Sequence, residues 1–213
     1  HRDKAKQAVR ESLVLLKNKN KALPIDKTAK KIVVVGEHAN NAGLQSGGWT
    51  IAWQGVNESY KGATTILDGI KAIAKGEVIY DEYGEENHSD AAVIIVVVGE
   101  TPYAEFFGDI GNGTGKYQLT LSEAHQKYIT KYADKGPKVI VVLISGRPLV
   151  VTNQIEQSDA FIAAWLPGSE GSGIAEVLFG DFNSKLSEWS SQGVTYSSDE
   201  DLRRIFIKSE IRI

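Results

Sequence analysis

The chain has 213 residues, of which 42% are hydrophobic and 24% charged, a balance typical of globular proteins. Its formal net charge of −3 leaves no basic excess to neutralise phosphates, so no nucleic-acid partner is expected. The absence of cysteine excludes disulfides, thiolate metal sites and a cysteine nucleophile. No apolar run approaches the roughly 18 residues of a membrane span, so no membrane partner is expected either. Because the chain opens with His1 and lacks methionine, we expect a piece of a longer gene product, or a processed or engineered chain.

Helices and strands are predicted from hydrophobic spacing, in chain order. The first element is an amphipathic helix over residues 2–18, where apolar residues recur near helical spacing. Short, continuously apolar runs predict strands at residues 31–36, 78–80, 91–98, 138–145 and 160–166. Helices are predicted between them at residues 65–74, 122–133, 148–157 and 169–179, with Ser122 as an N-cap.

Strands that alternate with helices predict an α/β fold. We expect a doubly wound, mostly parallel sheet of five or six strands with helices on both faces. In such sheets ligands bind at the carboxyl ends of the strands. Two long irregular segments, residues 37–64 and 100–121, follow strands at that end, and long loops in compact domains are often functional. Residues 185–213 are polar at first and then partly alternating, like an edge strand.

Cofactor motifs are missing from the sequence. Neither the dinucleotide fingerprint G-x-G-x-x-G after the first strand nor the phosphate-binding G-x-x-x-x-G-K-[ST] is present. The four histidines are not spaced as a metal pair on one helix. We therefore expect no cofactor and no metal. His38, just past a strand end, is interpreted as a hydrogen-bonded loop residue, with a role in a site as the alternative.

Two loops hold residues that could do chemistry. In residues 47–55, Trp49 and Trp53 stand four apart, and their indole faces could stack on sugar rings or could anchor the loop in the core. In residues 99–109, Glu100, Glu105 and Asp109 follow a buried strand in an aromatic setting. A carboxyl in apolar surroundings suits a general acid, whereas an ordinary solvated acidic loop is the alternative.

At these loops the sequence resembles the second domain of glycoside hydrolase family 3, in particular β-D-glucan exohydrolases and β-glucosidases. The resemblance runs from about residue 1 to residue 183 and predicts an α/β sandwich domain over residues 1–184. It rests on the following motifs: R-E-S-L-V-L-L-K-N (10–18), L-P (23–24), G-G-W-T-I-x-W-Q-G (47–55), V-G-E-x-P-Y-A-E-x-x-G-D (98–109), L-I-S-G-R-P (143–148), A-A-W-L-P-G-S-E-G (163–171) and L-F-G-D-F (178–182).

The resemblance implies a division of labour between two domains. A preceding (β/α)₈ barrel would supply the aspartate nucleophile, and this chain would supply the acid/base, which falls on Glu105 in P-Y-x-E. Trp53 matches the position that clamps the sugar at the leaving-group side, and Trp49 matches a supporting position. Glu100 and Asp109 would be structural. The implied reaction is retaining, exo-acting release of terminal glucose from a β-glucan or β-glucoside, and the implied location is periplasmic or secreted.

Two departures from the family pattern matter. No barrel is present, so we expect the chain alone to be inactive. Residues 185–213 do not follow the usual glycine-lysine-leucine continuation and are set apart as a divergent tail of unknown role. Two other interpretations stay open: a non-catalytic carbohydrate-binding or interaction module, and a nucleotide-binding α/β protein.

Overall fold

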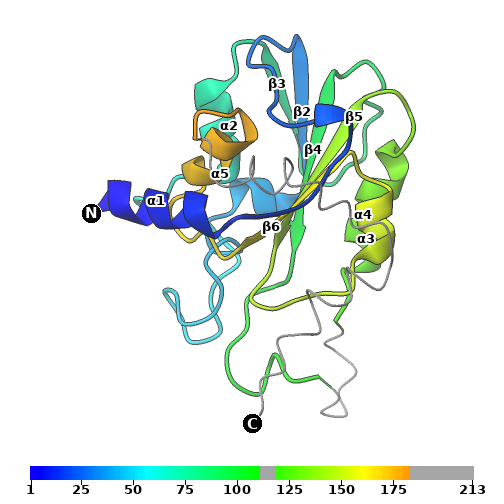
Figure 1. Ribbon diagram of the computed structural model, residues 1–213. Helices are drawn as coiled ribbons and strands as arrows, with labels where there is room; N and C mark the ends of the chain where they lie inside the picture. Colours follow the sequence, from blue (N-terminus) through cyan, green and yellow to red (C-terminus); the bar gives the residue numbers. More distant parts are fainter. Residues whose placement is uncertain (111–118, 183–213) are drawn as a thin grey trace.

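The computed structural model describes residues 1–110 and 119–182 and shows one central sheet with helices on both faces (Figure 1). In the described residues the sheet has six strands in the order β1-β6-β5-β4-β2-β3, and all neighbours pair in parallel except β1, which is antiparallel to β6. The predicted doubly wound, mostly parallel α/β fold is confirmed. The strands are β1 (Val14–Asn18), β2 (Lys31–Val35), β3 (Glu77–Asp81), β4 (Val93–Gly99), β5 (Lys138–Ile144) and β6 (Ala160–Trp165).

The helices cover the sheet in two groups. One hydrophobic cluster packs three helices against one face, and a second cluster packs two helices against the other (Figure 1). The first group is α1 (Arg2–Ser12), α2 (Ile66–Ile73) and α5 (Ser172–Leu178); the second is α3 (Glu123–Tyr132) and α4 (Thr152–Glu156). The part of the chain that the structure describes also has two 3₁₀ turns, η1 (Lys19–Lys21) and η2 (Glu37–Asn40). None of these helices has the length and apolar character needed to cross a membrane.

The continuously apolar strands are explained by this double cover. Along β4, Ile95 and Val97 face the first cluster, while Ile94 and Val96 face the second, and all four are fully buried. A strand with one solvated face would instead alternate apolar and polar residues.

The helix predicted over residues 2–18 is confirmed only as far as residue 12, and its last six residues are not helical. The helix ends at Ser12, and Leu13 takes an extended conformation. Val14 and Leu15 then pair with Ala163 and Ile162 at the edge of the sheet. Apolar residues at helical spacing favoured a longer helix, but pairing with β6 satisfies the backbone and buries Leu16, so the tertiary contact overrides the local preference.

The other helix predictions hold, with shifted boundaries. Thr65 caps α2 in a capping box with Asp68. Ser122 caps α3, as predicted, by accepting a hydrogen bond from the His125 amide N–H at 3.2 Å. The helix predicted over residues 148–157 is confined to α4. The edge strand predicted within residues 185–213 lies outside the described residues.

Candidate active site

The candidate site lies where the strand order reverses direction. Strands β2 and β4 are neighbours, but the chain passes from β2 to β3 at one edge and from β4 through β5 to β6 toward the other. Ligands of open α/β sheets bind in the crevice at the carboxyl ends of such strands, because the two outgoing loops diverge there. The segments 37–64 and 100–121 begin at β2 and β4, so both long loops start at this point.

Trp53 and Glu105, predicted as platform and acid, are in direct contact. The indole Nε1 of Trp53 donates a hydrogen bond to Oε2 of Glu105 at 2.5 Å, although the residues are 52 apart in the sequence. Both side chains are exposed, with Trp53 44% accessible. The ring of Phe107 meets the Trp53 ring edge-on, with 5.8 Å between their centroids. The structure therefore presents a carboxyl and an indole together at the surface.

Trp49 lies beside this pair. Its ring centroid is 6.4 Å from that of Trp53, and its amide N–H donates to the Trp53 carbonyl oxygen at 2.9 Å. The side chain is 69% accessible. Because both tryptophans are exposed, the alternative that they anchor the loop in the core is wrong.

The loops that carry Trp53 and Glu105 are joined by close backbone contacts. Gln54 Oε1 accepts a hydrogen bond from the Ala104 amide N–H at 2.8 Å. A Cβ atom at Gly48 would stand only 2.1 Å from the Tyr103 carbonyl oxygen, so only glycine permits this approach. The two loops are therefore packed directly against each other. Because Glu105 follows Ala104, its position depends on the close approach that Gly48 allows.

Among the described residues of these loops, three that are not glycine have left-handed backbone conformations. Trp49, Ile51 and Phe106 have φ angles of 60°, 66° and 66°. Such conformations cost of order 1–3 kcal/mol each and cluster at functional sites. Ile51 is β-branched, for which this region is especially unfavourable. The strain lies in the same two loops as the Trp53–Glu105 pair.

Arg147 supports the loop after β4, a role that sequence reasoning missed. Its Nε donates to Glu100 Oε1 at 2.8 Å, and its Nη1 donates to the Gly108 carbonyl oxygen at 2.6 Å. The guanidinium also lies 4.4 Å from the centroid of the Tyr103 ring. The sequence held one signal for this role, a charged residue shortly after the end of β5. Residues 145–148 were instead interpreted only as a tight turn. Glu100 has the structural role expected of it.

Tyr103 completes this support. Its hydroxyl donates to Glu100 Oε2 at 3.4 Å. Burial, followed by the negative charge of Glu100, raises the pKa of Tyr103 to about 12, against the opposing effect of Arg147. The phenol therefore stays protonated and remains a donor at neutral pH.

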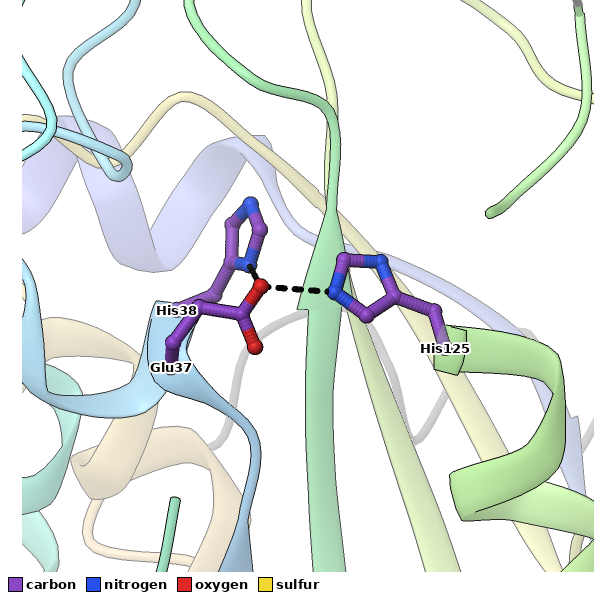
Figure 2. Close-up of side chains that lie close together, drawn as sticks. All are labelled: Glu37, His38 and His125. Atoms are coloured by element: carbon purple, nitrogen blue, oxygen red, sulfur yellow. Dashed lines mark hydrogen bonds and ion pairs between the residues drawn. The ribbon is translucent and has the colours of Figure 1, made fainter. Parts of the chain in front are cut away.

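A second group of polar side chains lies close together near the start of the segments 37–64 and 100–121 (Figure 2). Glu37 and His38 come from η2, and His125 comes from α3. Glu37 Oε1 lies 2.9 Å from His125 Nε2 and 3.9 Å from His38 Nδ1. Burial, with the neighbouring His125, lowers the pKa of His38 to about 4, so its imidazole is neutral at pH 7. A search for pairs on one helix could not find this group, because the two histidines come from different elements.

The family is established by comparison with known proteins. Residues 13–187 match the family model described as "Glycosyl hydrolase family 3 C-terminal domain". The α/β sheet and this match place the chain among the non-barrel domains of glycoside hydrolases. The chain belongs to glycoside hydrolase family 3 and corresponds to its C-terminal domain.

Several relatives are whole enzymes. The chain is 30% identical to the lysosomal beta glucosidase of Dictyostelium discoideum, covering 85% of this chain and 24% of that protein. It is 30% identical to the periplasmic beta-glucosidase of Salmonella typhimurium, covering 86% and 27%. Among solved structures, the exo-1,3/1,4-beta-glucanase ExoP of a Pseudoalteromonas species is 41% identical with a TM-score of 0.73, covering 84% of this chain and 29% of that one. The chain thus spans about a quarter of the length of these curated relatives.

Proposed function

We propose that this chain is the acid/base-bearing domain of a retaining, exo-acting β-glucosidase or β-glucan exohydrolase that releases terminal glucose. Residues 1–184 form the family 3 domain, residues 185–213 form a divergent tail, and a (β/α)₈ barrel outside this chain carries the aspartate nucleophile. The observation that carries the proposal is the hydrogen bond from Trp53 to Glu105 at the exposed carboxyl end of the sheet. Relatives named beta-glucosidase and exo-1,3/1,4-beta-glucanase support the substrate class.

In this proposal Glu105 acts on a glycosidic bond that lies between this domain and the barrel. Retaining hydrolysis uses two carboxyl groups about 5–5.5 Å apart, one as nucleophile and the other first as acid and then as base. Glu105 protonates the departing glycosidic oxygen and later takes a proton from the attacking water. The Trp53 N–H fixes one of its oxygens, and a general acid must be held within hydrogen-bond reach of its target.

The aromatic side chains around Glu105 suit a sugar substrate and a neighbouring domain. In this proposal the face of Trp53 stacks on the apolar C–H face of the sugar at the leaving-group side, and Trp49 supports it. Ile51, Phe106 and Phe107 are also exposed on the same loops. Clustered exposed apolar side chains are typical of interaction surfaces, and the absent barrel is the partner that this proposal assigns to them.

The division of labour is tested by mixing the domains. The chain alone should not hydrolyse a β-glucoside, and the chain mixed with its barrel should. Glucose release is measured in both samples and in the barrel alone. Glucoside binding without hydrolysis in the mixture would favour the carbohydrate-binding alternative, and protection of the chain by nucleotides but not by glucose would favour the nucleotide-binding one.

The Trp53–Glu105 bond can be tested separately from the aromatic surface. In the complete enzyme, Trp53→Phe keeps an aromatic face but removes the N–H, so kcat should fall by roughly 10-fold, as for one hydrogen bond to a charged group, while KM changes little. Trp53→Ala removes both features and should also raise KM. Steady-state kinetics on a β-glucoside measure both constants.

Trp49→Phe is the matched control. It makes the same chemical change in the neighbouring tryptophan and leaves the Trp53–Glu105 hydrogen bond intact. Its kcat should stay close to that of the parent. An equal loss of kcat in Trp49→Phe and Trp53→Phe would contradict a specific role for the bond.

A further inference from the structure

The group formed by Glu37, His38 and His125 has more acceptor capacity than its surroundings satisfy. Each residue offers one ligand atom, and these three atoms lie within 4.8 Å of one another. Within residues 1–110 and 119–182, three buried atoms of the group have no hydrogen-bond partner: Glu37 Oε2, His38 Nδ1 and His125 Nδ1. Buried polar atoms without partners are rare in folded proteins. Of these three, His38 Nδ1 is the one that an ion held between the side chains would take as a ligand atom.

The protonation of His38 can be derived from its contacts. Its Nε2 lies 3.1 Å from the Glu100 carbonyl oxygen, which can only accept, so Nε2 carries the proton. Nδ1 of the neutral ring therefore holds a lone pair. His38 is 2% accessible, and its Nδ1 points at the Glu37 carboxylate, 3.9 Å away (Figure 2). A lone pair and a carboxylate thus face each other with no proton between them.

We propose that Glu37, His38 and His125 form a binding site for one Zn²⁺-type divalent transition-metal ion. Two imidazole nitrogens and one carboxylate oxygen are ligands that Zn²⁺ accepts, with water in the fourth position. The side chain of Glu37 is 29% accessible, which gives the ion and its water a way in. The proposal does not depend on the role of Glu105.

The geometry is close to what zinc needs. With ligand bonds of about 2.0–2.1 Å in a tetrahedron, ligand atoms stand roughly 3.3 Å apart. The observed separations from Glu37 Oε1, 2.9 Å to His125 Nε2 and 3.9 Å to His38 Nδ1, lie on either side of that value. All three ligand atoms lie within 4.8 Å of one another, so the side chains must draw together when the ion binds. The Glu100 carbonyl holds the distal nitrogen of His38, which is the usual outer-shell partner of a ligating histidine.

Binding changes the tautomer of His125. Its Nε2 donates a proton to Glu37 in the metal-free protein, since a carboxylate can only accept. When the ion takes that position, the lone pair of Nε2 forms the metal bond and the ring proton moves to Nδ1. Among the described residues Nδ1 has no hydrogen-bond partner, so binding must also give this N–H an acceptor such as water. No other group gains or loses a proton. The bound ion would connect η2 to α3 and, through His38, would hold the backbone at Glu100.

The test uses Zn²⁺ calorimetry and Co²⁺ absorption on the full 213-residue chain. A His1→Ala background is used throughout, because an amino-terminal histidine can bind the same ions. The parent should bind one Zn²⁺, give the visible absorption of four-coordinate Co²⁺ and gain roughly 5–10 °C in Tm at about 100-fold excess over Kd. Glu37→Gln and His125→Gln each remove one ligand and should weaken binding by at least about 10-fold.

His88→Gln is the matched control, because His88 is another buried histidine bonded to a carboxylate, Asp81, outside the group. It should bind like the parent. Absence of both the Co²⁺ band and a Tm shift in the parent at millimolar metal would overturn the proposal, whatever the variants do. Equal affinity in the parent, Glu37→Gln and His125→Gln would also overturn it, because the ion would then bind elsewhere.

Discussion

Glu105→Ala in the complete enzyme should slow hydrolysis of alkyl β-glucosides by about 10²–10⁴-fold, the usual contribution of a general acid. Such substrates have poor leaving groups and need protonation as the glycosidic bond breaks. Nitrophenyl β-glucosides release a nitrophenolate, which departs without being protonated. The rate of their glycosylation step should therefore fall far less. The measurement is kcat/KM for both substrate classes, because this constant reports the first irreversible step.

Asp109→Ala is the control for this experiment, because Asp109 is an exposed carboxylate on the same loop. Its kcat/KM should stay near the parent value for both classes. The assignment of Glu105 fails if its alanine variant loses the same factor on both classes, since protonation of the leaving group would then not be what was removed.

The second large effect is expected from Gly48→Ala. The added Cβ would stand 2.1 Å from the Tyr103 carbonyl oxygen and 3.1 Å from the Ala104 Cβ, so the two loops must move apart. Glu105 follows directly after Ala104, and a displacement of about 1 Å at a catalytic group can cost 10²-fold in rate. We expect about that loss in kcat/KM, with Tm changed little because no core strand is touched.

Gly62→Ala separates the clash from the general cost of losing a glycine. Gly62 lies in the same long segment, has a φ of +91° and has no neighbour within 4 Å of an added Cβ. It should cost about 1 kcal/mol of stability through strain alone and leave the activity intact. A similar loss of activity in both variants, measured with Tm in parallel, would argue against the close contact as the cause.

The sheet could be predicted because its strands have a simple physical signature. β2, β4, β5 and β6 are buried on both faces, so each appears as an uninterrupted apolar run that ends near a glycine. β1 lacks this signature. Its residues are partly exposed and continue the apolar spacing of α1. Their extended conformation depends on pairing with β6, which lies nearly 150 residues away in the sequence.

Site residues that lie in long sequence motifs could be predicted from the sequence. Site residues that are far apart in the sequence and are brought together only by the fold could not. Trp53 and Glu105 lie in loops that the family resemblance marks, and both loops follow strands at the end of the sheet where ligands were expected. Arg147 and His125 lie far along the chain from Glu100 and Glu37, which they contact. Nothing in local composition reports such partners, because each depends on which strands become neighbours in the sheet.

The reversal of strand order between β2 and β4 also has a consequence for divergence within the family. The segments that bear Trp53 and Glu105 leave neighbouring strands, and the helices that follow them lie on opposite faces of the sheet. Insertions or deletions at their tips therefore leave strand pairing and helix packing untouched. The tips of this rim can therefore vary in sequence and length, whereas the close backbone contact at Gly48 restricts its base.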